Sequence, residues 1–234
     1  MGALRATTDP SRDLLLAAAG LCRISGWSAF DAGDRAAFWQ AHATALDLAR
    51  QAQHPPAVTA IVVYAGRAEI HSGNHRQAAK LFELVSVRRE LDAVEWGLLG
   101  STYAPHAPDS ARHALGRLRS SAGSDTPDAV SMIGHVSADV GDYETAVAAY
   151  SAVLPLRSGG ILAVQEVAPL AVVHLQAGEV DTGAQYAATA LDLAASVRSA
   201  ACVDAVGRLA EALASQSGST CQDLAQQART AMAA

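Results

Sequence analysis

The stretch Asp139-Val140-Gly141-Asp142 recurs in three further versions along the chain, and the four versions together decide the fold. Each version separates two apolar helical patterns. Glycine supplies the left-handed residue that ends the first helix, and the polar residue after it can cap the second helix. The pattern therefore predicts a series of helical hairpins. The other versions are Phe30-Asp31-Ala32-Gly33-Asp34, Ile70-His71-Ser72-Gly73-Asn74 and Leu175-Gln176-Ala177-Gly178-Glu179.

The spacing of these turn glycines indicates a regular repeat. Gly33 and Gly73 lie 40 positions apart, and Gly141 and Gly178 lie 37 positions apart. The interval of 68 positions from Gly73 to Gly141 leaves room for one more hairpin, whose turn we expect at Ala104-Pro105-His106-Ala107-Pro108-Asp109. Self-similarity at a fixed period is typical of helical solenoids, in which each hairpin buries its apolar face against its neighbours.

Composition supports this prediction and excludes several classes of protein. The 234 residues are 50% hydrophobic but only 5% aromatic, and alanine and leucine, which favour helices, dominate. The net charge is −6 and the basic residues are scattered, so direct binding to nucleic acid is not expected. Three cysteines do not form a disulfide framework, and no apolar run is long enough to span a membrane. We expect a cytoplasmic protein.

The hairpin expected between Gly73 and Gly141 also resembles a known family. Its first helix contains Trp96-x-x-Leu99-Gly100-x-x-Tyr103, which resembles the first-helix signature of the tetratricopeptide repeat. The resemblance extends to residues around the turn glycines, where helix packing in this family needs a small residue seven positions before the glycine and an aromatic residue nine positions after it. These positions are occupied by Gly66 and Phe82 in one hairpin and by Gly134 and Tyr150 in another.

The resemblance implies an all-α fold, a tetratricopeptide-like right-handed α-α superhelix in a single domain. Pro169 falls inside the first helix of the last hairpin and is expected to delay or kink that helix. Two further helices are expected to cap the exposed end of the stack. The five predicted hairpins cover residues 12–52, 57–90, 91–121, 127–157 and 161–196, and the capping helices cover 199–232.

The first third of the chain resembles a narrower family. The segments Gly26-Trp27-Ser28-Ala29-Phe30-Asp31-Ala32-Gly33-Asp34 and Ala45-Leu46-Asp47-Leu48-Ala49-Arg50 are similar to the repeat region of actinobacterial helix-turn-helix regulators. In that family the repeats bind or sense something, while an amino-terminal head binds the operator. Because this sequence begins at or near the repeats, we expect the partner-binding half alone.

In tetratricopeptide superhelices the first helix of each hairpin lines a concave groove, which implies a set of binding residues here. For the aromatic members of the set, packing between helices is an equally good interpretation. For the arginines the alternative is a solvated or locally paired charge. For the histidines the alternative is a polar residue in the wall of the groove that binds nothing. The chaperone-type carboxylate clamp of the family is absent. The candidate groove residues are Arg23, Trp27, Phe30, Arg67, His71, Ser101, His135 and Asp139.

Three functions remain open. The first is a non-enzymatic module that binds a protein or peptide, with a homodimer also possible. The second is a small-molecule sensor whose pocket is lined by Trp27, Arg67 and His135. The third is an enzyme, or an accessory subunit of one, that uses His71 or His135 with Asp139. No cofactor is expected, and no metal site either, because a turn separates His71 from the histidine four positions later.

Overall fold

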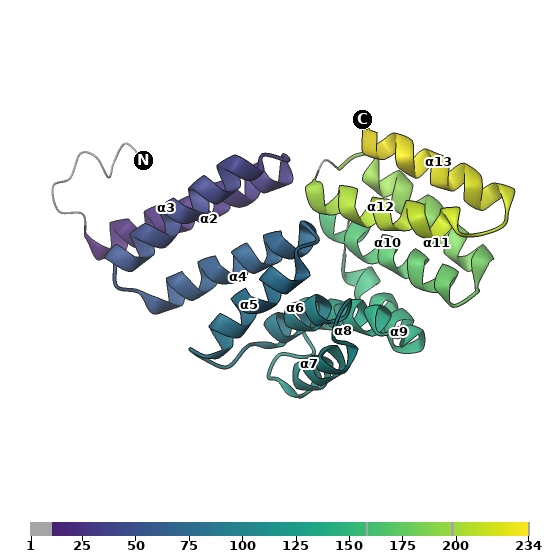
Figure 1. The fold of residues 1–234 in the computed structure, drawn as a ribbon. Coiled ribbons are helices and arrows are strands. Elements are labelled where there is room, and N and C mark those ends of the chain that lie inside the picture. The colour runs from purple at the N-terminus through teal and green to yellow at the C-terminus, as the bar shows by residue number, and fades with distance from the viewer. Residues whose placement is uncertain (1–10, 158, 198, 234) are drawn as a thin grey trace. The chain divides into compact units, whose positions relative to one another are not determined.

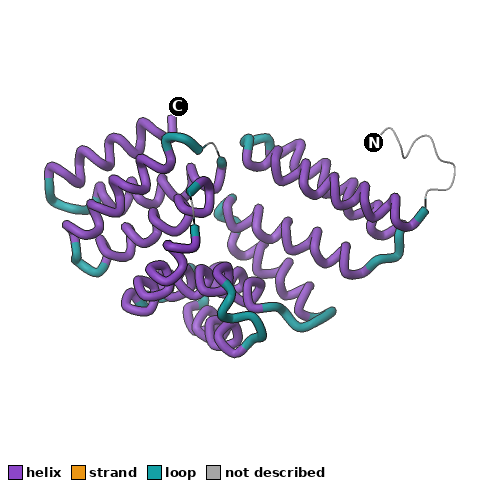
Figure 2. The backbone as a smooth tube through the Cα atoms, turned by 180° about the vertical axis from the view of Figure 1, so that it is seen from behind, coloured by secondary structure: helices purple, strands orange, loops and turns teal. Residues whose placement is uncertain are grey.

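The computed structural model describes residues 11–157, 159–197 and 199–233. All regular elements in these ranges are helices, and the ranges contain no strand (Figure 2). The chain divides into two compact units, Met1–Glu90 and Leu91–Ala234, which are described one at a time. The predicted all-α helical-repeat class is confirmed.

The first unit contains two helical hairpins (Figure 1). Helix α2 (Arg12–Asp31) pairs with α3 (Arg35–Gln51), and α4 (Pro55–His71) pairs with α5 (His75–Ser86). The second hairpin is joined to the first because α4 packs against both α2 and α3. The sequence pattern predicted both hairpins in these places.

The second unit contains three more hairpins and a terminal helix pair. The terminal pair packs on the hairpin before it, α12 against α10 and α13 against α11, as expected for capping helices. A single core formed by side chains from these four helices extends through this end of the unit. The elements are α6 (Ala93–Tyr103), α7 (Pro108–Ser120), α8 (Pro127–Asp139), α9 (Tyr143–Val153), the 3₁₀ turn η1 (Leu154–Leu156), α10 (Gly160–Gln176), α11 (Val180–Ala194), α12 (Ala200–Ala214) and α13 (Ser219–Ala233).

The turn glycines adopt the backbone conformation that the sequence predicted. Gly33, Gly73, Gly141 and Gly178 have φ angles of 82°, 73°, 82° and 84°, which is the left-handed region that other residues avoid. A Cβ atom at any of the four would meet no atom within 4 Å. Backbone conformation, rather than lack of space, therefore requires glycine at these turns.

Capping by the following residue is confirmed at two of the four turns. The side chain of Asp34 accepts a hydrogen bond from the Ala37 amide at 2.9 Å, and Asp142 accepts one from Thr145 at 3.3 Å. Asn74 and Glu179 occupy the same position but form no side-chain capping bond. A helix thus begins after the polar residue at all four turns, although the side chain caps it at only two.

Small residues allow the two helices of a hairpin to approach closely, as the family pattern implied. A Cβ atom at Gly66 on α4 would lie 2.8 Å from the ring of Phe82 on α5. A Cβ atom at Gly134 on α8 would likewise lie 2.8 Å from the ring of Tyr150 on α9. Both rings are fully buried, so the glycine and the aromatic residue form one packing unit.

Pro169 lies within α10, which begins at Gly160, so this proline does not delay the start of its helix. Proline has no backbone N–H, and the carbonyl of Gln165 therefore lacks the donor that a helix normally provides at that point.

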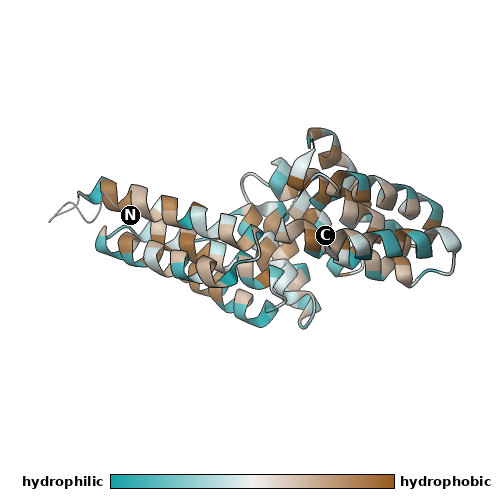
Figure 3. Ribbon diagram, turned by 90° about the horizontal axis from the view of Figure 1, so that it is seen from above, coloured by the Kyte–Doolittle hydropathy of each residue, from teal (hydrophilic) through white to brown (hydrophobic). Residues whose placement is uncertain are grey.

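Hydrophobic and hydrophilic residues are interspersed along the helices (Figure 3). None of the described helices is both long and apolar enough to cross a membrane.

Candidate functional site

One face of the first unit gathers aromatic rings and arginines from α2 and α4. Arg23 and Trp27 lie one helical turn apart on α2, and Tyr64, Arg67 and His71 follow the same spacing on α4. Because α2 and α4 pack together, the two rows meet. We call these five residues the arginine–aromatic face.

Cation–π contacts hold the arginines of this face in place. The guanidinium Cζ atom of Arg23 lies 4.3 Å from the ring centroid of Tyr64. The Cζ atom of Arg67 lies 5.5 Å from the centroid of Trp27 and 5.7 Å from that of Tyr64. The Trp27 and Tyr64 rings meet edge to face at 5.6 Å. Stacking on rings orients a guanidinium group without neutralising its charge.

The remaining first-unit candidates are placed differently with respect to solvent. Phe30 is only 2% exposed, stacked on Trp27 at 5.3 Å, so it supports the face from within the core. Trp27 itself is half-buried and keeps part of its ring accessible. The His71 ring lies 6.1 Å from the Trp27 ring at the end of α4. His75 begins α5, so the two histidines do not share a helix, as expected.

The two arginines of the face form no ion pair with any residue between 11 and 90, the part of the first unit that the structure describes. The positive charge of Arg23 also affects the pKa of His42. Burial lowers the pKa of His42, a hydrogen bond to the Phe38 carbonyl opposes this, and the positive charge of Arg23 lowers the pKa further. The face is therefore electropositive within a chain whose net charge is −6.

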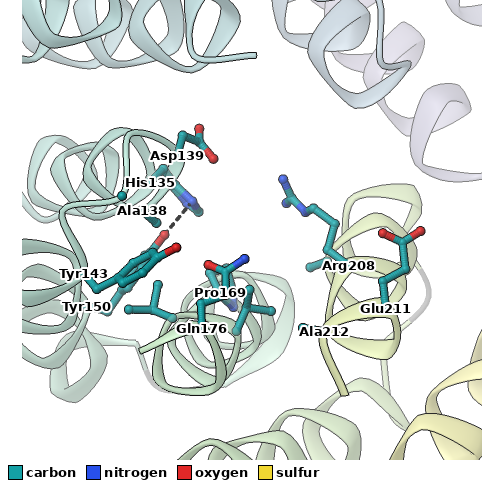
Figure 4. Close-up of a pocket in the computed structure, with 14 residues that line it drawn as sticks. His135, Ala138, Asp139, Tyr143, Tyr150, Pro169, Gln176, Arg208, Glu211 and Ala212 are labelled. Carbon is teal, nitrogen blue, oxygen red and sulfur yellow. Dashed lines mark hydrogen bonds between the residues drawn. The ribbon is translucent and has the colours of Figure 1, made fainter. Parts of the chain in front are cut away.

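A second candidate site is a pocket of about 540 Å³ in the second unit. Its walls come from α8 and α9 on one side and α12 on the other, with α10 between them (Figure 4). Pockets of 300–1,000 Å³ are typical of small-ligand sites. The polar residues that line it are His135, Asp139, Tyr143, Gln176, Arg208 and Glu211.

The α8 wall contains two of the predicted residues and a third lies beside it. The Nδ1 atom of His135 shares a 2.9 Å hydrogen bond with the hydroxyl of Tyr150. Tyr150 is 1% exposed, and burial raises its pKa well above the usual value, so the hydroxyl keeps its proton. Ser101 from α6 lies close enough to the Asp139 carboxylate to lower its pKa. The structure thus brings His135 and Asp139 to one pocket, with Ser101 near Asp139.

Asp139 and Arg208 lie on opposite walls of this pocket. Asp139 and Arg208 face each other across α10 in Figure 4, and no ion pair joins them. The side chain of Asp139 is exposed at the surface, but the helices around it remove part of the water from its carboxylate. This desolvation raises the pKa of Asp139 to about 6, while Arg208 and Ser101 act in the opposite direction. Arg208 also pairs with Asp204 at 3.5 Å.

Sequence reasoning did not identify four residues of these sites, which are Tyr64, Tyr143, Arg208 and Glu211. Tyr64 lies three positions before Arg67, so helical spacing alone was a usable signal for it. Arg208 and Glu211 lie on a capping helix outside the repeat alignment, and the sequence contained no signal for them. No group of three or more His, Cys, Asp or Glu side chains among the described residues has the arrangement of a metal site.

Comparison with known proteins assigns no family. No family model matches the chain, and no curated protein matches it either. Among solved structures, the crystal structure of MamA protein is similar with a TM-score of 0.43 and 18% sequence identity, covering 75% of this chain and 91% of that chain. A likeness of this degree carries no functional information.

Proposed function

We propose that this chain is a non-enzymatic helical-repeat module that binds a protein or peptide through faces formed by the first helices of its hairpins. The observation that supports this most directly is the arginine–aromatic face. Trp27 is half-buried there, and Arg23 and Arg67 are held by rings while forming no ion pair within the described first unit. Tryptophan and arginine are the residue types most enriched among the anchors of protein interfaces.

The biological setting that we propose rests on resemblance rather than geometry. The similarity of the first third of the chain to the repeat region of actinobacterial regulators suggests a role in controlling transcription or secondary metabolism in such a bacterium. We place the protein in the cytoplasm, where a partner protein, a second copy of the chain or a biosynthetic enzyme would be within reach. Because fold alone does not define function, the partner must be identified by experiment.

The first experiment compares two tryptophan variants in affinity captures from the source cells. Trp27→Ala removes the ring at the centre of the face. Trp39→Ala is a matched control, because Trp39 lies on α3, is 43% exposed and is not part of the face. We expect a specific partner, identified by mass spectrometry, to be lost with Trp27→Ala and retained with Trp39→Ala.

Arg67→Ala provides a second variant in case loss of the Trp27 ring disturbs the packing around Phe30. Far-UV circular dichroism establishes that each variant keeps its helices. If Trp27→Ala and Arg67→Ala both stay helical and still capture every partner of the wild-type chain, the proposal that this face binds a partner is wrong.

The pocket of the second unit favours a second candidate function, a small-molecule sensor. Its volume of about 540 Å³ and its polar walls suit a small polar ligand. A ligand that binds only the native state raises the midpoint of thermal unfolding. A metabolite extract that raises this midpoint for the wild-type chain but not for His135→Ala would support the sensor. An identical rise in both proteins would place the ligand elsewhere.

A further inference from the structure

We propose that the arginine–aromatic face binds an acidic segment of its partner, one that carries two carboxylate side chains close together in sequence. This inference rests on the proposed partner-binding function and specifies the chemistry of the partner. It concerns the first unit alone, where Arg23 and Arg67 converge on the ring of Tyr64.

The geometry provides two fixed cationic groups over a short span. Both guanidinium groups lie within 5.7 Å of the same ring centroid, one from each helix. Both residues are half-buried, and their stacking contacts already restrict their rotamers. Binding of a carboxylate therefore costs little free energy for ordering the arginine side chains, and a guanidinium group can donate two parallel hydrogen bonds to its oxygens.

Charge complementarity selects an anionic partner. The nearest acidic residue along α4 is Glu69, and its carboxylate accepts a 2.7 Å hydrogen bond from Asn74 instead. No described residue of the first unit forms an ion pair with Arg23 or Arg67. Two like charges that share one ring repel each other, and an acidic ligand would remove this repulsion.

The convergence of only two arginines on one ring suits a peptide better than a nucleic acid. Alternate residues of an extended strand lie roughly 6.6 Å apart on one face, and residues four apart on a helix are about 5–6 Å apart. Either arrangement presents two carboxylates to two neighbouring arginines. Nucleic acids require a row of cations along several phosphates, whereas the next arginine of this unit, Arg35, is engaged with Ser72 and the Phe30 ring.

The apolar part of the face favours the same class of partner. The half-buried Trp27 ring has its centroid 5.5 Å from the Cζ atom of Arg67, so a ligand held by the arginine lies next to an aromatic residue. An acidic residue next to an apolar one would satisfy both. We therefore expect a segment of mixed acidic and apolar side chains rather than a uniformly acidic tract.

Fluorescein-labelled peptides test this proposal with the full chain. Each peptide carries two glutamates separated by one, two or three residues in a leucine- and alanine-containing scaffold, and matched peptides carry glutamine or lysine instead. We expect at least one glutamate peptide to bind the wild-type chain about tenfold more tightly than its glutamine counterpart, and to weaken as salt rises. If no glutamate peptide exceeds its glutamine counterpart, the proposal is overturned.

Charge reversal distinguishes this site from general electrostatic attraction. Arg23→Glu with Arg67→Glu should weaken the glutamate peptide at least about tenfold and should create binding of the lysine peptide. Arg76→Glu with Lys80→Glu is the matched control, since it changes the net charge equally on exposed positions of α5. Equal losses in the two double variants would overturn the proposal. A preference for phosphoserine peptides with no binding of glutamate peptides would overturn the carboxylate assignment.

The partner captured from cells separates failure of this inference from failure of the proposed function. If Trp27→Ala releases the partner while Arg23→Gln with Arg67→Gln retains it, the face binds a partner but acidity does not select it. If both variants retain the partner, the proposed function itself is wrong. If both release it and the partner's acidic segment reproduces the binding as a peptide, the inference is supported.

Discussion

Substitution of Gly66 by alanine tests whether close helix approach, rather than helix propensity, governs the first unit. Gly66 lies on α4, and the three nearest atoms to a Cβ placed there all belong to the Phe82 ring, at 2.8, 3.0 and 3.3 Å. Phe82 is fully buried, so the ring has no free space into which it can move. The added methyl group must therefore push α4 and α5 apart or strain the ring.

Two opposing effects set the magnitude. Replacing glycine by alanine within a helix stabilises it by about 0.8–1.0 kcal/mol. Forcing an extra methyl group into a well-packed core costs about 1–3 kcal/mol. Gly20 on α2 is the matched control, because it is also helical and a Cβ there meets nothing within 4 Å. We expect Gly20→Ala to raise the free energy of unfolding by about 1 kcal/mol and Gly66→Ala to fall below it by about 1–3 kcal/mol.

Urea unfolding followed by far-UV circular dichroism measures both free energies. Phe82→Leu adds a second test, since it removes the ring atoms that the methyl group would meet. The double variant with Gly66→Ala should then be more stable than the sum of the single changes by about 0.5–3 kcal/mol. The reasoning is refuted if Gly66→Ala stabilises as much as Gly20→Ala, or if the two changes at positions 66 and 82 simply add.

Three further predictions concern the second unit. Desolvation raises the folded-state pKa of Asp139 to about 6, above the ordinary value for an aspartate, so its ionisation opposes folding. The wild-type chain should therefore gain stability relative to Asp139→Asn as pH falls from 7 toward 4, and parallel unfolding midpoints across that range would contradict this. Tyr150→Phe removes the 2.9 Å, partly buried hydrogen bond to His135 and should lower the free energy of urea unfolding by about 0.5–1.5 kcal/mol. An unchanged value would show that the bond makes no net contribution. Arg157→Met removes the cation that lies 3.6 Å from the buried carboxylate of Glu166 and should lower the free energy of unfolding by about 3–5 kcal/mol. Arg112→Met, which breaks an exposed pair with Asp109, should lower it by less than about 1 kcal/mol. Equal losses would show that burial does not strengthen the effect of removing the cation.

The hairpin boundaries were predictable from sequence because the signals that set them are local. The φ angle that Gly33 and Gly141 require depends on a few neighbouring residues, and so does the capping bond of Asp142. The pairing of Gly134 with Tyr150 was also predictable, since a fixed repeat places the same two positions opposite each other in every hairpin. Even here the local pattern had limits, because Pro169 lies within α10 without delaying its start.

The candidate sites were only partly predictable, because their members come from different hairpins. Sequence reasoning treated Trp27 and Phe30 alike, yet one is half-buried and the other is 2% exposed. That difference depends on how the two helices that pack against α2 are positioned. Whether Arg23 has an acidic partner also depends on what the neighbouring helices bring near it.

The sequence by itself determined an all-α chain of helical hairpins, with turns at stated glycines and a capping pair at the end. Only the tertiary structure decided which distant side chains converge. Tyr64 meets an arginine 41 positions earlier, and Asp139 faces Arg208, 69 positions later, across the pocket. Periodicity specifies which face of a helix a residue occupies, but the packing of one hairpin on the next specifies what that face meets.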